Sequence, residues 1–222
     1  MKNITLIIPA KHESESLPSV LLELKKYTLN IIVILEPVDL KTIDSIKNFD
    51  CKIIHQKNKG YGNALILGIQ NVKTEYFCIF NADGSFNPIE ISAMFDLLKD
   101  KEADIIFASR YEKNAASDDD TLVTKIGNFI FTTLGKILFK LPITDILYTF
   151  ALGKTKMVLD LNLESQDFAF CVELPIKANK KNYKIFSIPS HERGRIGGKK
   201  KVNALRDGLY ILKKMIFMFL KN

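Results

Sequence analysis

Short apolar segments alternate with amphipathic segments through the first half of this chain, and this pattern restricts the possible folds most. Apolar runs rich in Ile, Val and Phe cover residues 4–9, 31–35, 52–55, 76–81 and 104–108. The apolar spacing of helices is found between them, over residues 17–27, 42–49, 60–72 and 88–99. Alternating strands and helices predict an α/β fold with a mostly parallel sheet flanked by helices. Ligands of such sheets bind at the carboxyl ends of the strands. The informative loops therefore follow residues 35, 55, 81 and 108.

Beyond Arg110 the regular alternation ends. A polar loop over residues 111–120 closes with the acidic run Asp118-Asp119-Asp120, which we interpret as exposed to solvent. Further helices are expected over residues 122–138, 152–161 and 170–180, with a last strand over 184–189. The chain has 222 residues and neither an internal repeat nor a flexible linker, which favours a single domain. We expect this domain to cover residues 1–203 and an amphipathic C-terminal helix to cover residues 204–222.

The charge of the chain indicates an anionic partner. The net charge is +7, and nine basic residues stand against one acid between residues 193 and 221. Nucleic acid, phospholipid headgroups and phosphorylated small molecules all fit this charge. Nucleic acid is disfavoured because the basic segment lacks the interleaved aromatic side chains of stacking platforms. The apolar run before Lys11 is short for a signal peptide, and no stretch approaches about 18–20 apolar residues. We therefore expect a cytoplasmic protein.

Polar side chains follow the fourth predicted strand directly. The segment Asn81-Ala82-Asp83-Gly84 ends an apolar run, and a helix begins near Pro88. Oxygen ligands at the carboxyl edge of a sheet suit a hard divalent cation, which would neutralise a diphosphate. Mg²⁺ usually takes only one or two protein carboxylates, so Asp83 alone is compatible with such a site. The same residues are equally typical of a simple turn, so this segment leaves both interpretations open.

Two glycines mark the junction between the third strand and the next helix. Gly60 and Gly62 let the backbone approach a phosphate or a sugar, and Lys59 is adjacent. The segment is not a dinucleotide fingerprint, because Leu65 occupies the place of the third glycine. Close packing of the helix on a strand explains the glycines equally well, so the motif is weak by itself.

The order of several motifs is more specific than any one of them. It runs Ile7-Ile8-Pro9-Ala10-Lys11-His12-Glu13, Asn58-x-Gly60-x-Gly62-x-Ala64, Asn81-Ala82-Asp83, Ala108-Ser109-Arg110-Tyr111, Asp145-Ile-Leu-Tyr-Thr149, Phe170-Cys-Val-Glu173-Leu and Arg193-Gly-Arg195-x-Gly197-Gly198-Lys199. This series resembles family 2 of the inverting glycosyltransferases over nearly the whole chain. Within that family it looks most like the polyprenyl-phosphate sugar synthases, such as the dolichyl-phosphate mannose synthases.

The resemblance implies a glycosyltransferase-A (GT-A) fold and the transfer of a hexose from a nucleotide-diphosphate sugar with inversion. It implies Mg²⁺ or Mn²⁺ bound at Asp83. The implied catalytic residues are Asp83, Arg110, Glu173 and Asp145. The implied donor-binding residues are Pro9, Ala10, Glu13, Glu36, Asn58, Gly60, Gly62, Asn81 and Ala82. The implied acceptor or phosphate ligands are Arg193, Arg195 and Lys199.

Two departures from the family pattern keep alternatives open. Asn81 replaces the first acid of the usual Asp-x-Asp, and Leu35 replaces the first acid of the pair that ends the second strand. A catalytically weakened sugar-nucleotide-binding protein is therefore one alternative. A nucleotidyltransferase on a similar sheet is another, although it would carry a glycine-rich loop after the first strand, where Pro9-Ala10-Lys11-His12-Glu13 has no glycine.

The acceptor implied by the resemblance is a polyprenyl phosphate or another glycolipid. A lipid phosphate is already anionic and needs little help from a base, whereas a hydroxyl needs a carboxylate such as Glu173 or Asp145. The C-terminal helix has one apolar face, and Lys213 and Lys214 lie outside it. That face consists of Leu205, Leu209, Leu212, Ile216 and Phe219. Either it packs on the core, or it lies at the inner surface of the membrane as a peripheral contact.

Overall fold

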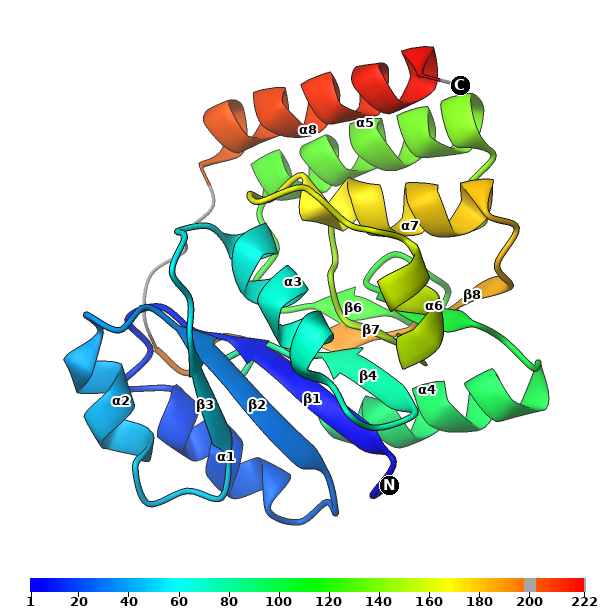
Figure 1. The fold of residues 1–222 in the computed structure, drawn as a ribbon. Coiled ribbons are helices and arrows are strands. Elements are labelled where there is room, and N and C mark those ends of the chain that lie inside the picture. The colour runs from blue at the N-terminus through cyan, green and yellow to red at the C-terminus, as the bar shows by residue number, and fades with distance from the viewer. Residues whose placement is uncertain (198–202, 222) are drawn as a thin grey trace.

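The computed structural model describes residues 1–197 and 203–221 and has one central sheet flanked by helices (Figure 1). The strands are β1 (Ile4–Pro9), β2 (Asn30–Leu35), β3 (Lys52–His55), β4 (Tyr76–Ile79), β5 (Ile105–Ser109), β6 (Ala116–Ser117), β7 (Ala151–Lys154), β8 (Ile185–Pro189) and β9 (His191–Glu192). The helices are α1 (Leu17–Leu24), α2 (Leu40–Ile46), α3 (Tyr61–Asn71), α4 (Ile89–Asp100), α5 (Leu122–Phe139), α6 (Thr155–Asp160), α7 (Phe170–Lys180) and α8 (Ala204–Leu220). The seven-stranded sheet has the order β3-β2-β1-β4-β7-β5-β8, which confirms the predicted single α/β domain with a mostly parallel sheet.

Alternating burial along the central strands gives the domain its two apolar layers. In β1, Ile7 packs with α3, α6, α7 and α8 on one face, whereas Leu6 and Ile8 pack with α1 and α4 on the other. Figure 1 shows the same division, with α3, α5, α7 and α8 on one side of the sheet and α1, α2 and α4 on the other. Because both faces are covered, the strands read as continuous apolar runs in the sequence.

The predicted helix over residues 152–161 is wrong in its first part. Residues Ala151–Lys154 form β7, which pairs antiparallel with both β4 and β5, and only Thr155–Asp160 are helical. Phe150, Ala151 and Leu152 are fully buried between these neighbours. A short buried apolar run has no periodicity that distinguishes strand from helix, and the pairing partners lie more than 40 residues away. β7 is the antiparallel member of the otherwise parallel sheet.

The C-terminal helix α8 packs beside α5 and α7, but not through the face that its sequence suggested. Its buried apolar residues are Ile211, Met215 and Met218. The predicted apolar face is largely exposed at Leu205, Leu209, Ile216 and Phe219. The ring of Phe139 in α5 meets that of Phe219, and Phe131 approaches Gly208, so the two helices run in the same direction. α8 therefore has apolar residues on both its core side and its outer side.

Helix α5 is also apolar on its outer side. Within residues 1–197 and 203–221, α5 alone is long and apolar enough to cross a membrane by length and composition, contrary to the expectation that no stretch is. Its buried side includes Asn128 and Thr132, which accept hydrogen bonds from the backbone N–H groups of Leu147 and Ile146. These polar contacts attach α5 to the domain, while Leu122, Phe129 and Ile137 are each about 70% exposed, at 74%, 71% and 69%.

Candidate functional site

A cleft of about 740 Å³ lies at the carboxyl ends of the parallel strands. It is lined by the loops after β1, β2, β3, β4 and β5, and by the N-terminal part of α8. Strand-end loops converge there because parallel strands present all their carboxyl ends at one edge of the sheet. The sequence-predicted residues that line it are Pro9, Ala10, Glu13, Glu36, Gly60, Asn81, Ala82, Asp83, Arg110 and Arg195. The cleft therefore brings together most of the predicted donor-binding residues and two of the four predicted catalytic residues, Asp83 and Arg110.

The loops after β1 and β2 form one wall of the cleft. Lys11 pairs with Glu36 at 3.0 Å, and the Glu13 carboxylate accepts a hydrogen bond of 2.7 Å from the Ser16 hydroxyl. Asp39 caps the N-terminus of α2 and accepts the backbone N–H of His12. Burial would raise the pKa of Asp39, but these hydrogen bonds outweigh it and leave the pKa below its ordinary value. The two loops are thus fixed to each other by side-chain contacts.

The glycine-rich segment forms another wall of the cleft through Gly60, Tyr61 and Ala64. Gly60 has a φ of +125°, which L side chains rarely adopt. A Cβ at Gly62 would stand 2.0 Å from the carbonyl oxygen of Ser165, so Gly62 is needed for close packing on the 165–167 loop. Asn58 is exposed. Neither Asn58 nor Gly62 is among the described residues that line the cleft, so the structure does not place them in contact with a ligand bound there.

We expect Gly62→Ala to destabilise the protein by about 1–3 kcal/mol, because the new methyl group meets two backbone carbonyls that cannot move independently. The matched control is Gly127→Ala in α5, where an added Cβ meets nothing within 4 Å. That change should stabilise the protein by up to about 1 kcal/mol, since alanine is the better helix former. Urea unfolding measures both. Equal effects of the two substitutions would contradict the packing role of Gly62.

The loop after β4 places Asp83 in the cleft. Asp83 Oδ1 accepts the backbone N–H of Ser85 at 3.1 Å, and Oδ2 lies 3.3 Å from Nη2 of Arg195. Asn81 faces inward along its own loop, because its amide donates to the Ser85 hydroxyl and accepts the backbone N–H of Phe86. Asp83 therefore presents one carboxylate oxygen to the cleft, and this oxygen holds a cationic group. Such an oxygen suits a divalent cation, although no cluster of three or more His, Cys, Asp or Glu residues is found in the part of the chain that the structure describes.

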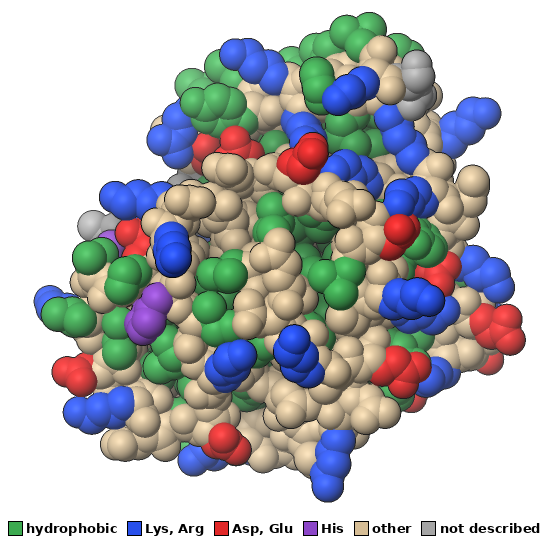
Figure 2. All heavy atoms as spheres, viewed as in Figure 1, with side chains coloured by type: hydrophobic (Ala, Val, Ile, Leu, Met, Phe, Trp, Pro, Cys, Tyr) green, Lys and Arg blue, Asp and Glu red, His purple; other side chains and the backbone are tan. Residues whose placement is uncertain are grey.

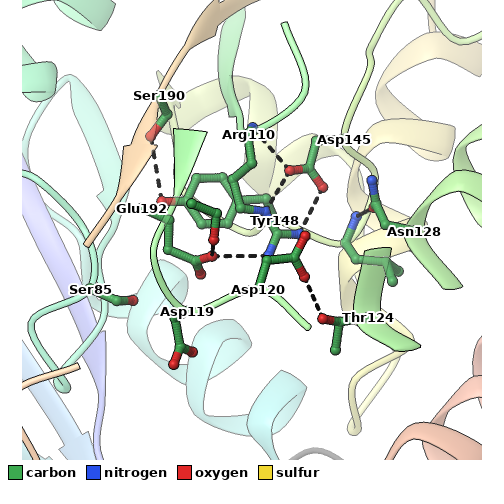
Figure 3. A network of polar contacts seen from close by, with 12 residues as sticks. Ser85, Arg110, Asp119, Asp120, Thr124, Asn128, Asp145, Tyr148, Ser190 and Glu192 are labelled. Carbon is green, nitrogen blue, oxygen red and sulfur yellow. Dashed lines mark hydrogen bonds and ion pairs between the residues drawn. The ribbon is translucent and has the colours of Figure 1, made fainter. Parts of the chain in front are cut away.

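Arg110 is the centre of a largely buried ionic network (Figure 3). Its Nε lies 2.7 Å from Asp145, and its Nη1 lies 3.3 Å from Glu192. Burial would lower the pKa of Arg110, but the attraction of Asp145 outweighs it and raises the pKa above its ordinary value. Asp145 is fully buried, and both of its carboxylate oxygens accept hydrogen bonds from Arg110. It is absent from the described lining of the cleft. Asp145 thus positions Arg110, and the structure does not support its predicted role as a catalytic base.

Glu173 also differs from its predicted role. Its carboxylate is fully buried and binds Lys177 at 2.9 Å and Lys214 at 3.0 Å. It also accepts the backbone N–H groups of Glu164 and Ser165. Burial would raise the pKa of Glu173, but these partners lower it to about 2. An anion this well bound is a poor proton acceptor at neutral pH, and Glu173 does not occur among the described cleft residues. Glu173 therefore lies in a buried ionic network outside the described lining of the cleft, where it holds neighbouring elements together.

The predicted phosphate ligands separate into different environments. Arg193 forms a two-pronged pair with Glu23 at 2.9 and 3.0 Å and donates to the carbonyl of Phe86, so it fastens its segment to α1 instead of facing the cleft. Arg195 reaches into the cleft, where it contacts Asp83 and Asp119. Lys199 lies outside the described residues. Of Arg193 and Arg195, Arg195 alone lines the cleft, so its role as a phosphate ligand stays a prediction.

Several cleft residues were not found from the sequence. They include Asp119, Asp120, Tyr148, Asp167, Phe168, Glu192, Arg206 and Tyr210. The run Asp118–Asp120 was interpreted as solvent-exposed, but β6 pairs with β9 and draws its end into the cleft. Asp120 accepts hydrogen bonds from Tyr111 and Thr124, which hold its pKa below the ordinary value although burial acts to raise it. One feature of the sequence indicates these residues: three consecutive acids lie between the Arg110 motif and the start of the next helix.

Comparison with known proteins agrees with this geometry. The model of the family described as "Glycosyl transferase family 2" matches residues 5–161. An uncharacterised glycosyltransferase of Mycobacterium bovis is 24% identical over 208 residues, covering 94% of this chain and 93% of that protein. An uncharacterised protein of Methanocaldococcus jannaschii is 25% identical over 194 residues, covering 84% of this chain and 79% of that protein.

Solved structures show the same fold at low sequence identity. Glucosyl-3-phosphoglycerate synthase from Mycobacterium tuberculosis, in complex with Mn²⁺, UDP and glucosyl-3-phosphoglycerate, superposes with a TM-score of 0.73 at 13% identity. The match covers 99% of this chain and 79% of that one. Mannosyl-3-phosphoglycerate synthase from Rubrobacter xylanophilus gives a TM-score of 0.75 at 11% identity, covering 98% of this chain and 74% of that one. The family model covers well over half of the chain and the sheet has the GT-A arrangement, so the protein belongs to glycosyl transferase family 2.

Proposed function

We propose that this protein transfers a hexose from a nucleotide-diphosphate sugar to a lipid phosphate, with inversion at the anomeric carbon and with Mg²⁺ or Mn²⁺ as cofactor. The observation that carries the proposal is the position of Asp83, which lines the same cleft at the carboxyl edge of the sheet as the loops after β1 and β2 and the glycine-rich segment. Membership of glycosyl transferase family 2 supports the reaction class.

The donor fits the end of the cleft that β1 and β2 border. Pro9 and Ala10 give this wall an apolar part, on which a base would pack. Glu36 gives it a charged part, which would accept hydrogen bonds from the nucleoside. With the nucleoside against this wall, the diphosphate of the donor would lie next to Asp83. A divalent cation bound there supplies neutralisation of the diphosphate and so makes the nucleoside diphosphate a better leaving group. The neighbours of known structure support this choice, because their complexes contain Mn²⁺ or Mg²⁺ together with UDP.

The transfer is written as a single displacement. An acceptor oxygen forms the new bond to the anomeric carbon while the bond to the diphosphate oxygen breaks, and the electron pair leaves with the nucleoside diphosphate. A lipid phosphate brings its own negative charge, so no protein group has to remove a proton. This agrees with the finding that Glu173 and Asp145 are engaged elsewhere. A hydroxyl acceptor would instead need a cleft carboxylate such as Asp120 or Glu192.

The lipid character of the acceptor is inferred from the position of the cleft beside α5 and α8. Thr124 of α5 and Arg206, Tyr210 and Ile211 of α8 line the cleft. The same two helices leave large apolar side chains uncovered, with Leu205 at 84% exposure and Leu122 at 74%. Figure 2 shows hydrophobic side chains together with Lys and Arg at the top of the molecule, where α8 lies in Figure 1. An anionic bilayer would cover the apolar residues and attract the basic ones.

A transfer assay tests the proposal. UDP-, GDP-, CDP- and dTDP-hexoses are supplied with Mn²⁺ and one of two acceptors, a polyprenyl phosphate in vesicles or soluble 3-phosphoglycerate. Transfer to the polyprenyl phosphate that stops when EDTA is added is the expected result. Transfer to 3-phosphoglycerate alone would keep the reaction class and overturn the lipid acceptor. Binding of a nucleotide sugar without transfer to either acceptor would favour the catalytically weakened protein.

A charge reversal tests the membrane contact. Lys213 of α8 and Lys221, which directly follows this helix, are both exposed. We expect Lys213→Glu with Lys221→Glu to lower co-sedimentation with phosphatidylserine-containing vesicles more than tenfold, at about 1 kcal/mol for each basic residue lost. Lys214 is unsuitable, because its reversal would place a carboxylate against buried Glu173. The control with the same net charge is Lys26→Glu with Lys41→Glu, next to α1 and in α2. Equal loss in both variants would mean that net charge alone, and not this face, attracts the vesicles.

A further inference from the structure

We propose that Asp119 supplies the second carboxylate of the divalent-cation site at Asp83, and that the Arg195 guanidinium occupies the cation position until a cation arrives. The inference rests on the proposed function and deepens it. It identifies a ligand that lies outside the Asn81-Ala82-Asp83 motif, on a segment of the chain that the motif does not predict.

The geometry around Arg195 points to this site. Its Nη2 lies 3.3 Å from Oδ2 of Asp83 and 3.3 Å from Oδ2 of Asp119. The two carboxylate oxygens are therefore at most about 6.6 Å apart, with one positive group between them. Both carboxylates are mostly buried, with 16% and 19% of the side-chain surface exposed. Two partly desolvated anions that converge on one point create a strong preference for positive charge at that point.

The backbone holds Asp119 in this position. The short strands β6 and β9 pair in parallel and join Ala116 to His191 and Ser117 to Glu192. The backbone N–H of Asp118 then donates to the carbonyl of Glu192 at 2.8 Å. The residue that follows this last hydrogen bond is Asp119. A polar loop on the surface would not need such pairing, so the pairing serves to bring the acidic run to the cleft.

Asp119 also restores the charge that Asn81 removes. Both polar atoms of the Asn81 amide are engaged within the loop, with Ser85 and Phe86. Asp83 would therefore be the cation's single carboxylate ligand from that loop. With Asp119 the site has two, and diphosphate oxygens and water complete the shell in the manner that Mg²⁺ prefers. The absence of a three-residue acidic or histidine cluster from the described residues is consistent with a site that is completed by its substrate.

Arg195 is suited to be displaced. Its segment is fastened by the backbone, because Arg193 N–H donates to the carbonyl of Ser85 and Ile196 N–H donates to the carbonyl of Asp83, both at 2.8 Å. The Nε of Arg195 is buried without a hydrogen-bond partner among the described atoms, so the side chain is held by the contacts of its tip. A cation with a higher charge density competes for the same two oxygens, and the guanidinium that it releases is free to bind the donor diphosphate.

Mn²⁺ titration followed by electron paramagnetic resonance tests the site without measuring activity. In the presence of UDP, we expect Asp119→Asn to weaken Mn²⁺ binding at least tenfold, roughly the effect of removing a charge at this distance. The control is Asp118→Asn, because Asp118 is exposed and pairs with His191, and its removal should change binding less than twofold. Without UDP, Arg195→Met should tighten Mn²⁺ binding several-fold, since the competing cation is gone.

The outcomes separate the inference from the proposed function. Binding of Mn²⁺ by Asp119→Asn within twofold of the wild type overturns the inference while the metal-dependent reaction stands. Failure of the wild type to bind Mn²⁺ with any of UDP, GDP, CDP and dTDP overturns the metal dependence itself, and the inference with it. Unchanged Mn²⁺ affinity in Arg195→Met overturns the claim that Arg195 holds the cation position. Thermal unfolding of each variant shows whether it is folded, and Asp119→Ser replaces Asp119→Asn if the latter is not.

Discussion

Asp83→Asn is expected to lower Mn²⁺-dependent transfer at least a hundredfold and to abolish the stabilisation of the protein by Mn²⁺ with UDP. The substitution removes the negative charge while it keeps an oxygen for the Ser85 N–H, so the loop retains its shape. Removing one charge-stabilising group from a transition state costs about 10²–10³ in rate. Thermal unfolding with and without Mn²⁺ and UDP measures the binding part, and the transfer assay measures the rate.

Asp96→Asn is the matched control for this change. Asp96 is an exposed residue of α4, the helix that follows the Asp83 loop, so the same charge is lost from the same unit without touching the cleft. We expect this variant to bind and react like the wild type. Retention of Mn²⁺-dependent transfer by Asp83→Asn would refute the cation site and would leave Asn81-Ala82-Asp83 as turn chemistry.

The parallel half of the sheet was predictable because its strands are buried on both faces. In β1 and β4 every residue except Pro9 is buried, so the sequence shows short continuous apolar runs bounded by polar turns. Strand β7 failed the same reasoning. Its pairing with β4 and β5 is decided by contacts across about 45 to 75 residues, and nothing within Ala151–Lys154 itself distinguishes it from the start of α6.

The candidate site was predictable where one strand end supplies the residue. Arg110 directly follows β5, and Asp83 lies in the short loop after β4, so the strand order is enough to place both at this edge of the sheet. Asp119 and Glu192 were missed because two strands of two residues each bring them in, and such short strands have no periodicity to detect. Their pairing depends on a contact across about 75 residues.

Glu173 shows how a motif residue can serve the site without reaching it. Its carboxylate binds the backbone N–H groups at the start of the 164–168 loop, and that loop backs the glycine-rich wall. Gln166 accepts the backbone N–H of Asn63, and Phe168 stacks on Tyr61 with ring centres 5.0 Å apart. Through Lys214 the same carboxylate also holds α8. Glu173 thus links the helix beside the proposed acceptor region to the loop beside the proposed donor region.

We therefore expect Glu173→Gln to destabilise the protein by about 3 kcal/mol at pH 7, because a pKa held at about 2 instead of 4.5 corresponds to that free energy. The control is Glu164→Gln. The Glu164 carboxylate also pairs with Lys177, but its side chain is 75% exposed and the distance is longer, at 3.8 Å. It should change stability by less than about 1 kcal/mol.

The folded pKa of Glu173 lies below its unfolded value, so the stability that its carboxylate contributes is complete above about pH 4.5 and declines as the pH falls towards 2. Urea unfolding at pH 7 and pH 3.5 should show the difference between wild type and Glu173→Gln shrinking by about 1 kcal/mol. A difference that stays constant over this range would mean that the lost packing, and not the bound negative charge, accounts for the effect.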